Sequence, residues 1–221
     1  TEAGALFFYD PVIVVPANGT STAQMQCEIP SDVMLLSAAS HMHRRGVGYR
    51  SSLSGGSLPA PLSLFETTDW DNVALWPFDP PIAITAGQRI DYACDYRNDT
   101  AQTIIEGPSA EFDEMCMFIG AYYPRLDFAT EACRLAGSGP VLGGTQSCAQ
   151  TLACWQSAVD PIAAEQCAFD TCAPSSRAFN DFNGCVFTRC RTECSVGAGC
   201  SACIGANCAT EYTACQGAAC I

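Results

Sequence analysis

The sequence predicts a mainly β domain, an antiparallel sandwich or barrel, followed by a small disulfide-rich domain that is mostly α-helical. Two features of the 221 residues support this division. Residues 1–134 hold short runs rich in Val, Ile, Phe and Tyr between turn residues, which is typical of antiparallel strands. Residues 148–221 hold twelve of the 16 cysteines among Ala, Gly and Thr. The stretch 135–147 between them is rich in small residues and is predicted to be a linker.

The strands of the first domain are predicted from runs of apolar and aromatic residues. Asn18-Gly19, Gly55-Gly56 and similar dipeptides favour turns and separate the runs. Val, Ile, Phe and Tyr are enriched in strands because their side chains pack well on a pleated sheet. In chain order, we expect strands at residues 5–9, 12–15, 33–39, 47–53, 89–96 and 115–123.

Short helices are predicted in the cysteine-rich part. Asp160 followed by Pro161 favours a helix start, because Asp caps the first turn and proline fits the first helical position. Cysteine gaps of five or six residues suit nested bridges between two antiparallel helices. This arrangement predicts two disulfides, Cys148–Cys172 and Cys154–Cys167. The other eight cysteines allow 105 connectivities, and the sequence favours none of them.

An alternative for the cysteines is a thiolate cluster that binds Cu(I) or Zn(II), with Cys200 and Cys203 as its most ligand-like pair. Disulfides are favoured because 16 cysteines in one chain indicate an oxidising compartment. A segment so poor in large apolar residues also needs cross-links to be stable. We therefore expect a secreted protein, extracellular or periplasmic.

Charge and hydropathy argue against two kinds of partner. The chain has 23 acidic residues against ten basic ones, and its formal net charge is −13. This charge disfavours binding to nucleic acid or to an anionic membrane surface. No apolar run approaches the roughly 20 residues that a membrane-spanning helix needs, so no membrane span is expected.

The two histidines of the chain, His41 and His43, lie one residue apart. Residues two apart on a strand project from the same face, so both imidazoles would point together while Met42 points the other way. Two such imidazoles can share one metal ion. The alternative is a coincidental pair of surface or core histidines.

A metal site of this kind needs at least one more ligand, and the sequence has no third histidine. The candidates are a carboxylate, a free cysteine or a methionine from another strand. Carboxylates favour a harder metal ion, whereas a thioether with two imidazoles favours copper, and Cu(I) in particular. The residues alone leave the third ligand open.

The segment EFDEMCMFIGAYYP, residues 111–124, resembles the Met-Cys strand of the copper type II ascorbate-dependent monooxygenases, the family of the peptidylglycine and dopamine β-monooxygenases. The C-terminal catalytic domain of that family carries a His-x-His strand and then a Met-Cys strand, as do His41, His43 and Met115-Cys116 here. The resemblance covers roughly residues 5–133 and none of the tail. Its further matches are the segment PIAITAGQRIDYAC (residues 81–94), Cys27, Tyr122, Tyr123 and Cys133.

The resemblance implies a jelly-roll β-sandwich with two disulfides. In this sequence the family's disulfides would be Cys27–Cys133 and Cys94–Cys116. Each bridge closes a loop of the unfolded chain and should stabilise the domain by about 2–4 kcal/mol. The second bridge would also anchor the strand that carries the Met ligand.

The resemblance also implies one copper ion, bound by His41, His43 and Met115 as the metal-ligating and catalytic residues. An open position on the metal would remain for dioxygen or water. Without the resemblance, a Met near an apolar strand would be interpreted as an ordinary core residue.

The implied activity is hydroxylation of an aliphatic C–H bond, with ascorbate or another reductant as electron donor. Members of the two-domain type use a second copper, held by three histidines on an N-terminal domain. This sequence has no histidine left for such a site. The resemblance therefore implies an incomplete enzyme, which needs an N-terminal three-histidine copper domain or a separate redox partner.

Three positions depart from the pattern of the peptide-amidating relatives. Those relatives bind a substrate carboxylate with an Arg two residues before the first His, and with an Asn and a Tyr two and four residues after the Met. This chain has Ala39, Met117 and Ile119 there. We expect no peptidylglycine substrate, because its carboxylate would be left unpaired. Arg44 and Arg45 are expected to be solvated or paired with surface acids.

Three functions from different classes are consistent with the sequence. The first is the oxygen-activating half of a secreted copper monooxygenase, with the tail as a disulfide-bonded appendage. The second is a single-site copper-binding protein for capture or delivery without catalysis. The third is a structural or recognition module on an inherited scaffold.

Overall fold

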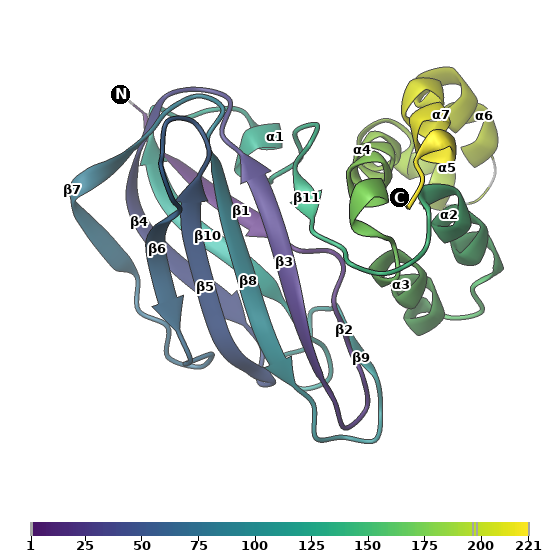
Figure 1. Cartoon of the computed structure of the whole chain (residues 1–221), viewed down its shortest axis with the longest axis horizontal. Coiled ribbons are helices and arrows are strands. Elements are labelled where there is room, and N and C mark those ends of the chain that lie inside the picture. The colour runs from purple at the N-terminus through teal and green to yellow at the C-terminus, as the bar shows by residue number, and fades with distance from the viewer. Residues whose placement is uncertain (1, 196, 198, 221) are drawn as a thin grey trace. The chain divides into compact units, whose positions relative to one another are not determined.

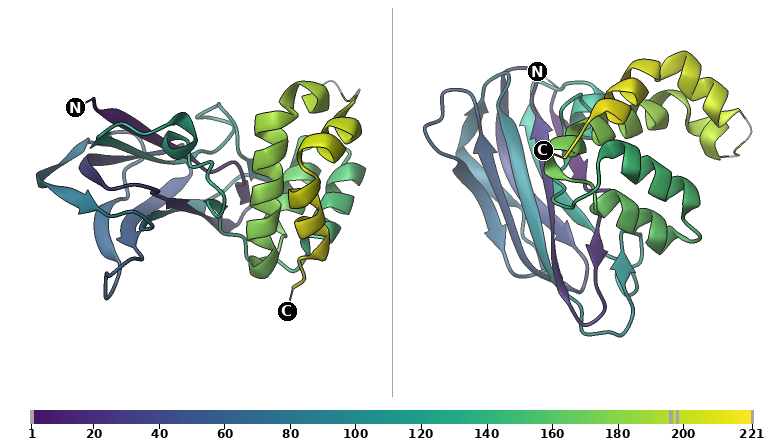
Figure 2. Two further views of the ribbon diagram at one scale, coloured as in Figure 1. Left: turned by 90° about the horizontal axis from the view of Figure 1, so that it is seen from above. Right: turned by 45° about the vertical axis from the view of Figure 1, so that its right-hand side comes forward.

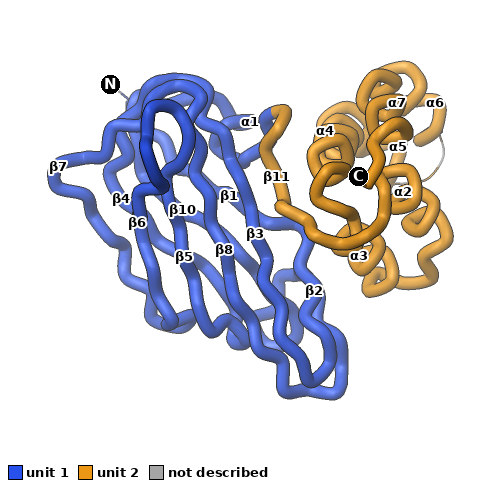
Figure 3. The backbone as a smooth tube through the Cα atoms, viewed as in Figure 1, with its two compact units in different colours: residues 1–135 blue, residues 136–221 orange. Residues whose placement is uncertain are grey.

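The structure, a computed structural model, describes residues 2–195, 197 and 199–220. The chain divides into two compact units, Thr1–Leu135 and Ala136–Ile221 (Figure 3). The first unit is built of strands and the second mainly of helices (Figure 1). This confirms the predicted fold class, a mainly β part followed by a helical, disulfide-rich part.

The first unit is a sandwich of two antiparallel layers, seen from three sides in Figure 1 and Figure 2. The first layer has the strand order β1 (Gly4–Tyr9), β10 (Cys116–Tyr123), β4 (Val33–Met42) and β7 (Trp76–Ile84). Neighbours in the second layer are β3 (Thr20–Glu28), β8 (Arg89–Arg97), β5 (Gly46–Ser54) and β6 (Leu62–Thr67). A short pair, β2 (Val14–Val15) with β9 (Ile104–Ile105), lies outside both layers.

The connectivity of the long strands is that of a jelly roll. From β1 the chain crosses to the other layer at β3, returns at β4 and crosses again at β5. After the β5–β6 hairpin it alternates in the same way through β7, β8 and β10. The jelly-roll sandwich implied by the resemblance is therefore confirmed.

The hydrophobic core lies between the two layers and is filled by alternate residues of each strand. On β10 the inward residues include Cys116, Phe118 and Tyr122, all fully buried. Phe118 stacks on Phe8 of β1 with ring centroids 5.7 Å apart. Burial of an aromatic side chain of this size contributes about 1.5–3 kcal/mol. The residues between them on β10 are half-buried and face away from the core.

Three long strands lie outside the runs named from the sequence, β3, β6 and β7, as do the two-residue strands at residues 104–105 and 139–140. The segment β7 contains Pro77, Pro80 and Pro81, which disfavour a strand because proline lacks an N–H for the ladder. It forms at the edge of its layer, where a missing donor is tolerated. In β3, the buried residues Ala23, Met25 and Cys27 alternate with Thr and Gln, so a continuous apolar run is absent. The predicted strand at 12–15 is shorter than expected.

Two disulfides brace the first unit. Cys94–Cys116 joins β8 to β10 and therefore ties one layer to the other. Cys27–Cys133 joins β3 to the residue after the short helix α1 (Phe128–Glu131). These are the two pairs that the resemblance implies.

The second unit is helical, with the short strand β11 (Gly139–Pro140) before its first helix. Its helices are α2 (Cys148–Ser157), α3 (Pro161–Phe169), α4 (Ala173–Arg189), α5 (Arg191–Ser195), α6 (Cys200–Asn207) and α7 (Ala209–Gly217). The predicted start at Asp160 is confirmed, because its side chain accepts a hydrogen bond from the Ala163 N–H at 2.8 Å and Pro161 is the first helical residue. Among the described residues, no helix has both the length and the apolar character to cross a bilayer.

Six disulfides hold the second unit together, and all 16 cysteines of the chain are paired. The pairs are Cys148–Cys215, Cys154–Cys167, Cys172–Cys220, Cys185–Cys208, Cys190–Cys203 and Cys194–Cys200. The predicted pair Cys154–Cys167 is confirmed, and Cys148–Cys172 is wrong. Helix α2 packs on α7 as well as α3, so Cys148 meets a cysteine from the end of the chain. A thiolate cluster at Cys200 and Cys203 is excluded because both thiols are oxidised.

The stretch expected to be a linker, residues 135–147, packs against α4. The N–H of Gly137 donates to the Asp181 carboxylate at 2.9 Å. Leu142 is buried, and its N–H donates to the Ser176 hydroxyl at 3.2 Å. Most of this stretch is therefore an ordered part of the second unit.

Candidate metal centre

The two histidines lie where β4 ends. His41 is on β4 and half-buried, and His43 follows in the turn to β5 with 3% of its surface exposed. Met42 between them is buried in the core, as the strand alternation predicts. Both imidazoles therefore leave the sandwich on the face that points away from the core.

The two imidazole rings are close enough to share one ion. Their centroids are 5.2 Å apart and their planes are nearly perpendicular, at 89°. A metal–nitrogen bond of about 2 Å puts each ring centroid roughly 3 Å from the ion, so rings about 5 Å apart can bind the same ion. The geometry of His41 and His43 thus fits a bound metal.

The protonation of both rings also fits metal binding. The Nδ1 atom of His43 lies 3.1 Å from the carbonyl oxygen of Asp113. Because a carbonyl can only accept, Nδ1 is the donor in this contact, an arrangement typical of histidines that bind a metal through Nε2. Burial, and then the neighbouring His43, lowers the pKa of His41, so this ring is neutral at pH 7.

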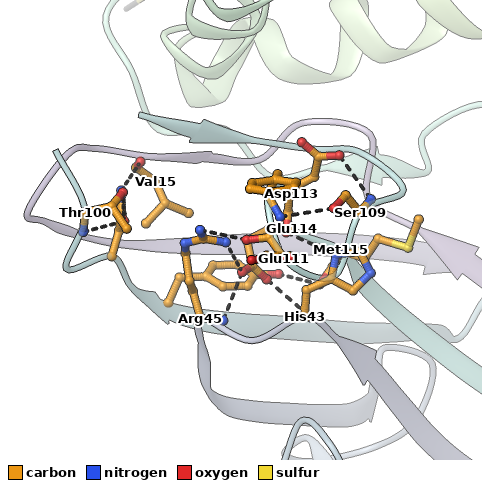
Figure 4. A network of polar contacts seen from close by, with 12 residues as sticks. Val15, His43, Arg45, Thr100, Ser109, Glu111, Asp113, Glu114 and Met115 are labelled. Carbon is orange, nitrogen blue, oxygen red and sulfur yellow. Dashed lines mark hydrogen bonds and ion pairs between the residues drawn. The ribbon is translucent and has the colours of Figure 1, made fainter. Parts of the chain in front are cut away.

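The strand pairing brings the Met-Cys segment beside the histidines. In the antiparallel ladder of β10 with β4, Cys116 lies opposite Met42 and Met117 lies opposite His41. The ladder ends at this Cys116–Met42 pair, and the next residue beyond it is Met115 on one segment and His43 on the other. The hydroxyl of Tyr96 donates to the Met115 carbonyl at 2.7 Å, which fixes the backbone there. In Figure 4 the side chains of His43 and Met115 extend to the same side of the network.

A buried ion pair behind the histidines was not predicted from the sequence. Glu114 has no exposed surface and accepts hydrogen bonds from the backbone N–H groups of His43 at 3.2 Å and of Arg45 at 2.9 Å. Its carboxylate also pairs with the Arg45 guanidinium at 3.4 Å (Figure 4). Burial raises the pKa of Glu114 to about 7, against the opposing effect of its bonds to Arg45 and His43.

The expectation for the two arginines is wrong in part. Arg44 is exposed, whereas Arg45 is 8% exposed and pairs with a buried acid instead of a surface one. The reason is that residues 43–46 form a turn, closed by the Gly46 N–H donating to the His43 carbonyl at 2.9 Å, and do not continue the strand. One feature of the sequence could have pointed to Glu114 as a residue of this site: it directly precedes Met115 in the segment that carries the resemblance.

The residues around His41 and His43 test two of the three candidate types of third ligand, the carboxylate and the free cysteine. In the part of the chain that the structure describes, no group of three or more His, Cys, Asp or Glu could hold a metal ion. A thiolate is also excluded, because the cysteines are in disulfides. These two findings concern the carboxylate and the cysteine, and they do not test the methionine.

Fold and site together define a class of protein: a disulfide-braced jelly roll with a His-x-His pair beside a Met-Cys strand. The family described as copper type II ascorbate-dependent monooxygenase, C-terminal domain, matches residues 5–142. This match covers more than half of the 221 residues, and the chain belongs to that family. Most of the helical unit lies outside the match. A comparison with curated proteins found no match to this chain.

Proposed function

We propose that the first unit binds one copper ion through His41, His43 and Met115 and is the oxygen-activating half of a secreted copper- and ascorbate-dependent monooxygenase. The observation that carries the proposal is the register of β10 with β4, which sets the Met-Cys segment against the His-x-His segment in a member of this family. Copper bound there would supply one-electron chemistry between Cu(I) and Cu(II), with ascorbate or another reductant as electron source.

The protein's own groups prepare this site in three ways. The Asp113 carbonyl accepts a hydrogen bond from Nδ1 of His43, which orients the ring and leaves Nε2 as the nitrogen for the metal. Glu114 fixes the backbone on both sides of the turn that follows the histidines. The core residues Met42 and Cys116, buried and opposite each other, hold the two segments in register from behind.

Hydroxylation of a C–H bond by dioxygen consumes two electrons from a reductant, and a single copper ion cycling between Cu(I) and Cu(II) carries one electron. The sequence has two histidines, both at this site. The activity therefore requires an N-terminal three-histidine copper domain or a separate redox partner. The eight disulfides support secretion, because such bridges persist in oxidising compartments.

The alternative is a single-site protein for copper capture or delivery. It is favoured by the ligand types, because two imidazoles with a thioether stabilise Cu(I). Assays with ascorbate, copper and oxygen separate the two functions. The monooxygenase proposal expects no coupled hydroxylation by the chain alone and turnover when a three-histidine copper domain is added. Tight Cu(I) binding without turnover under either condition would favour the alternative.

The ligand set is tested by titrating Cu(I) into the full chain and into a Met115→Leu variant. We expect the variant to bind Cu(I) about tenfold more weakly, because a soft ligand is lost while the side-chain volume is kept. Met34→Leu is the matched control, since Met34 is also half-buried on β4 but at the opposite end of the strand from His41. A chain that binds no copper would contradict the proposal and leave the structural or recognition module.

A further inference from the structure

We infer that Met117 supplies a second thioether to the copper ion, so that the reduced site has two imidazole and two thioether ligands. This inference rests on the proposed function, and it adds a ligand that the resemblance does not include. The peptide-amidating relatives have an Asn at the position of Met117, so a thioether here is a feature of this chain and not of those relatives.

The first observation is the strand register. Met117 on β10 lies directly opposite His41 on β4 in the antiparallel ladder. Residues in this relation have Cβ atoms about 4.5–5.5 Å apart and project from the same face of the sheet. The thioether of Met117 therefore starts from a backbone position directly opposite His41.

The second observation is the burial pattern along β10. Cys116 and Phe118 are fully buried, whereas Met117 between them is half-buried on the face away from the core. His41, the register partner of Met117, is half-buried on that face as well. A methionine on this face does not fill the core, and its three rotatable bonds let the sulfur reach toward the imidazole rings.

The two pairs form a compact set of donors across two neighbouring strands. One row is the ladder pair of His41 with Met117. The other row is His43 with Met115, the residues just beyond the end of that ladder. The imidazole centroids at 5.2 Å already allow one shared ion, and each row adds one sulfur to the same face. Two nitrogens and two thioether sulfurs suit Cu(I), while Cu(II) prefers nitrogen and oxygen ligands in a tetragonal arrangement.

The consequence is a site that favours the reduced ion. Replacement of Met117 by Leu should weaken Cu(I) binding by about tenfold and leave Cu(II) binding within about twofold, because the lost ligand interacts mainly with the soft ion. Leu keeps the volume and apolar character of the side chain, so the sandwich should fold as before.

The test uses the full chain loaded with one equivalent of Cu(I), with Cu(I) affinity measured by competition with a chromophoric chelator under anaerobic conditions. X-ray absorption at the copper edge counts sulfur scatterers per ion. We expect two sulfurs in the natural chain, one in Met117→Leu, one in Met115→Leu and none in the double variant. Met34→Leu should keep two.

Two outcomes overturn the inference, and they are distinguishable. One sulfur in the natural chain, lost in Met115→Leu and kept in Met117→Leu, would remove Met117 from the ligand set and leave the proposed function standing. A natural chain that binds no Cu(I) would contradict both the inference about Met117 and the proposed function. Even if a variant fails to fold, the sulfur count of the natural chain shows whether the reduced site has two thioether ligands or fewer.

Discussion

At the scale of single residues, the proposed copper site depends on the groups that orient its proposed ligands as much as on those ligands. His43 is oriented by the Asp113 carbonyl, and the turn behind it is held by Glu114. Strand alternation predicted that His41 and His43 share a face, since that follows from sequence spacing alone. The Glu114–Arg45 pair could not be predicted in the same way, because its partners are 69 residues apart and meet through the fold.

Replacing Arg45 by Leu should destabilise the metal-free protein. The change leaves the Glu114 carboxylate buried without its cation, which costs roughly 3 kcal/mol when a partner of a buried pair is removed. The Leu variant keeps the backbone bond from residue 45 but loses the guanidinium's hydrogen bond and charge, which lower the pKa of Glu114, so this pKa, already about 7, rises further.

The sign of the pH dependence follows from this shift. A carboxyl whose pKa is higher in the folded state contributes stability below its unfolded pKa, and this stability is lost as pH rises through the folded pKa. Urea unfolding should therefore show a larger deficit for Arg45→Leu at pH 8 than at pH 5. Arg44→Leu, at the exposed neighbour, is the control and should change stability by less than about 0.5 kcal/mol. Equal deficits at both pH values would contradict the role given to Glu114.

At the scale of elements, β10 links the core to the site. Its first residue, Cys116, is tied to β8, while the next residue, Met117, lies opposite His41 and faces away from the core. Apolar runs predicted β1, β4, β5, β8 and β10 because each alternates large residues toward the core. Edge strands β6 and β7 escaped prediction, since a strand with one free side tolerates proline and polar residues.

Removing the Cys94–Cys116 bridge by a double Cys→Ala change should lower the free energy of unfolding by about 3 kcal/mol, the value expected for a loop of this length. It should also weaken Cu(I) binding, because the backbone around Met115 loses an anchor. The control is a double change of Cys194 and Cys200, whose bridge lies in the second unit. Copper affinity that falls equally in both variants would contradict a local effect of the Cys94–Cys116 bridge.

At the scale of the whole molecule, each disulfide stays within its unit. Two lie in Thr1–Leu135 and six in Ala136–Ile221. The cysteine count predicted that the tail is cross-linked but not how, because connectivity depends on which helices pack together. Within the tail, the bridge between the adjacent helices α2 and α3 was the predictable one.

With all thiols oxidised, the chain should bind one Cu(I) rather than several. Thiol titration of the unreduced, unfolded protein should find less than one free thiol per chain, and peptide mapping should find no bridge between residues 1–135 and 136–221. Copper stoichiometry, measured on the same sample by elemental analysis, should approach one. Several copper ions per chain together with titratable thiols would restore the thiolate cluster in the tail.

The bridge between β8 and β10 restricts which electron donors are compatible with the protein. Structural disulfides of secreted proteins resist reduction down to potentials below about −300 mV, but a concentrated dithiol attacks them by exchange. An electron donor that acts through thiols could therefore reduce the Cys94–Cys116 bridge and release strand β10 from β8. A small one-electron donor without a thiol could reduce a copper ion at the proposed site and leave this disulfide intact.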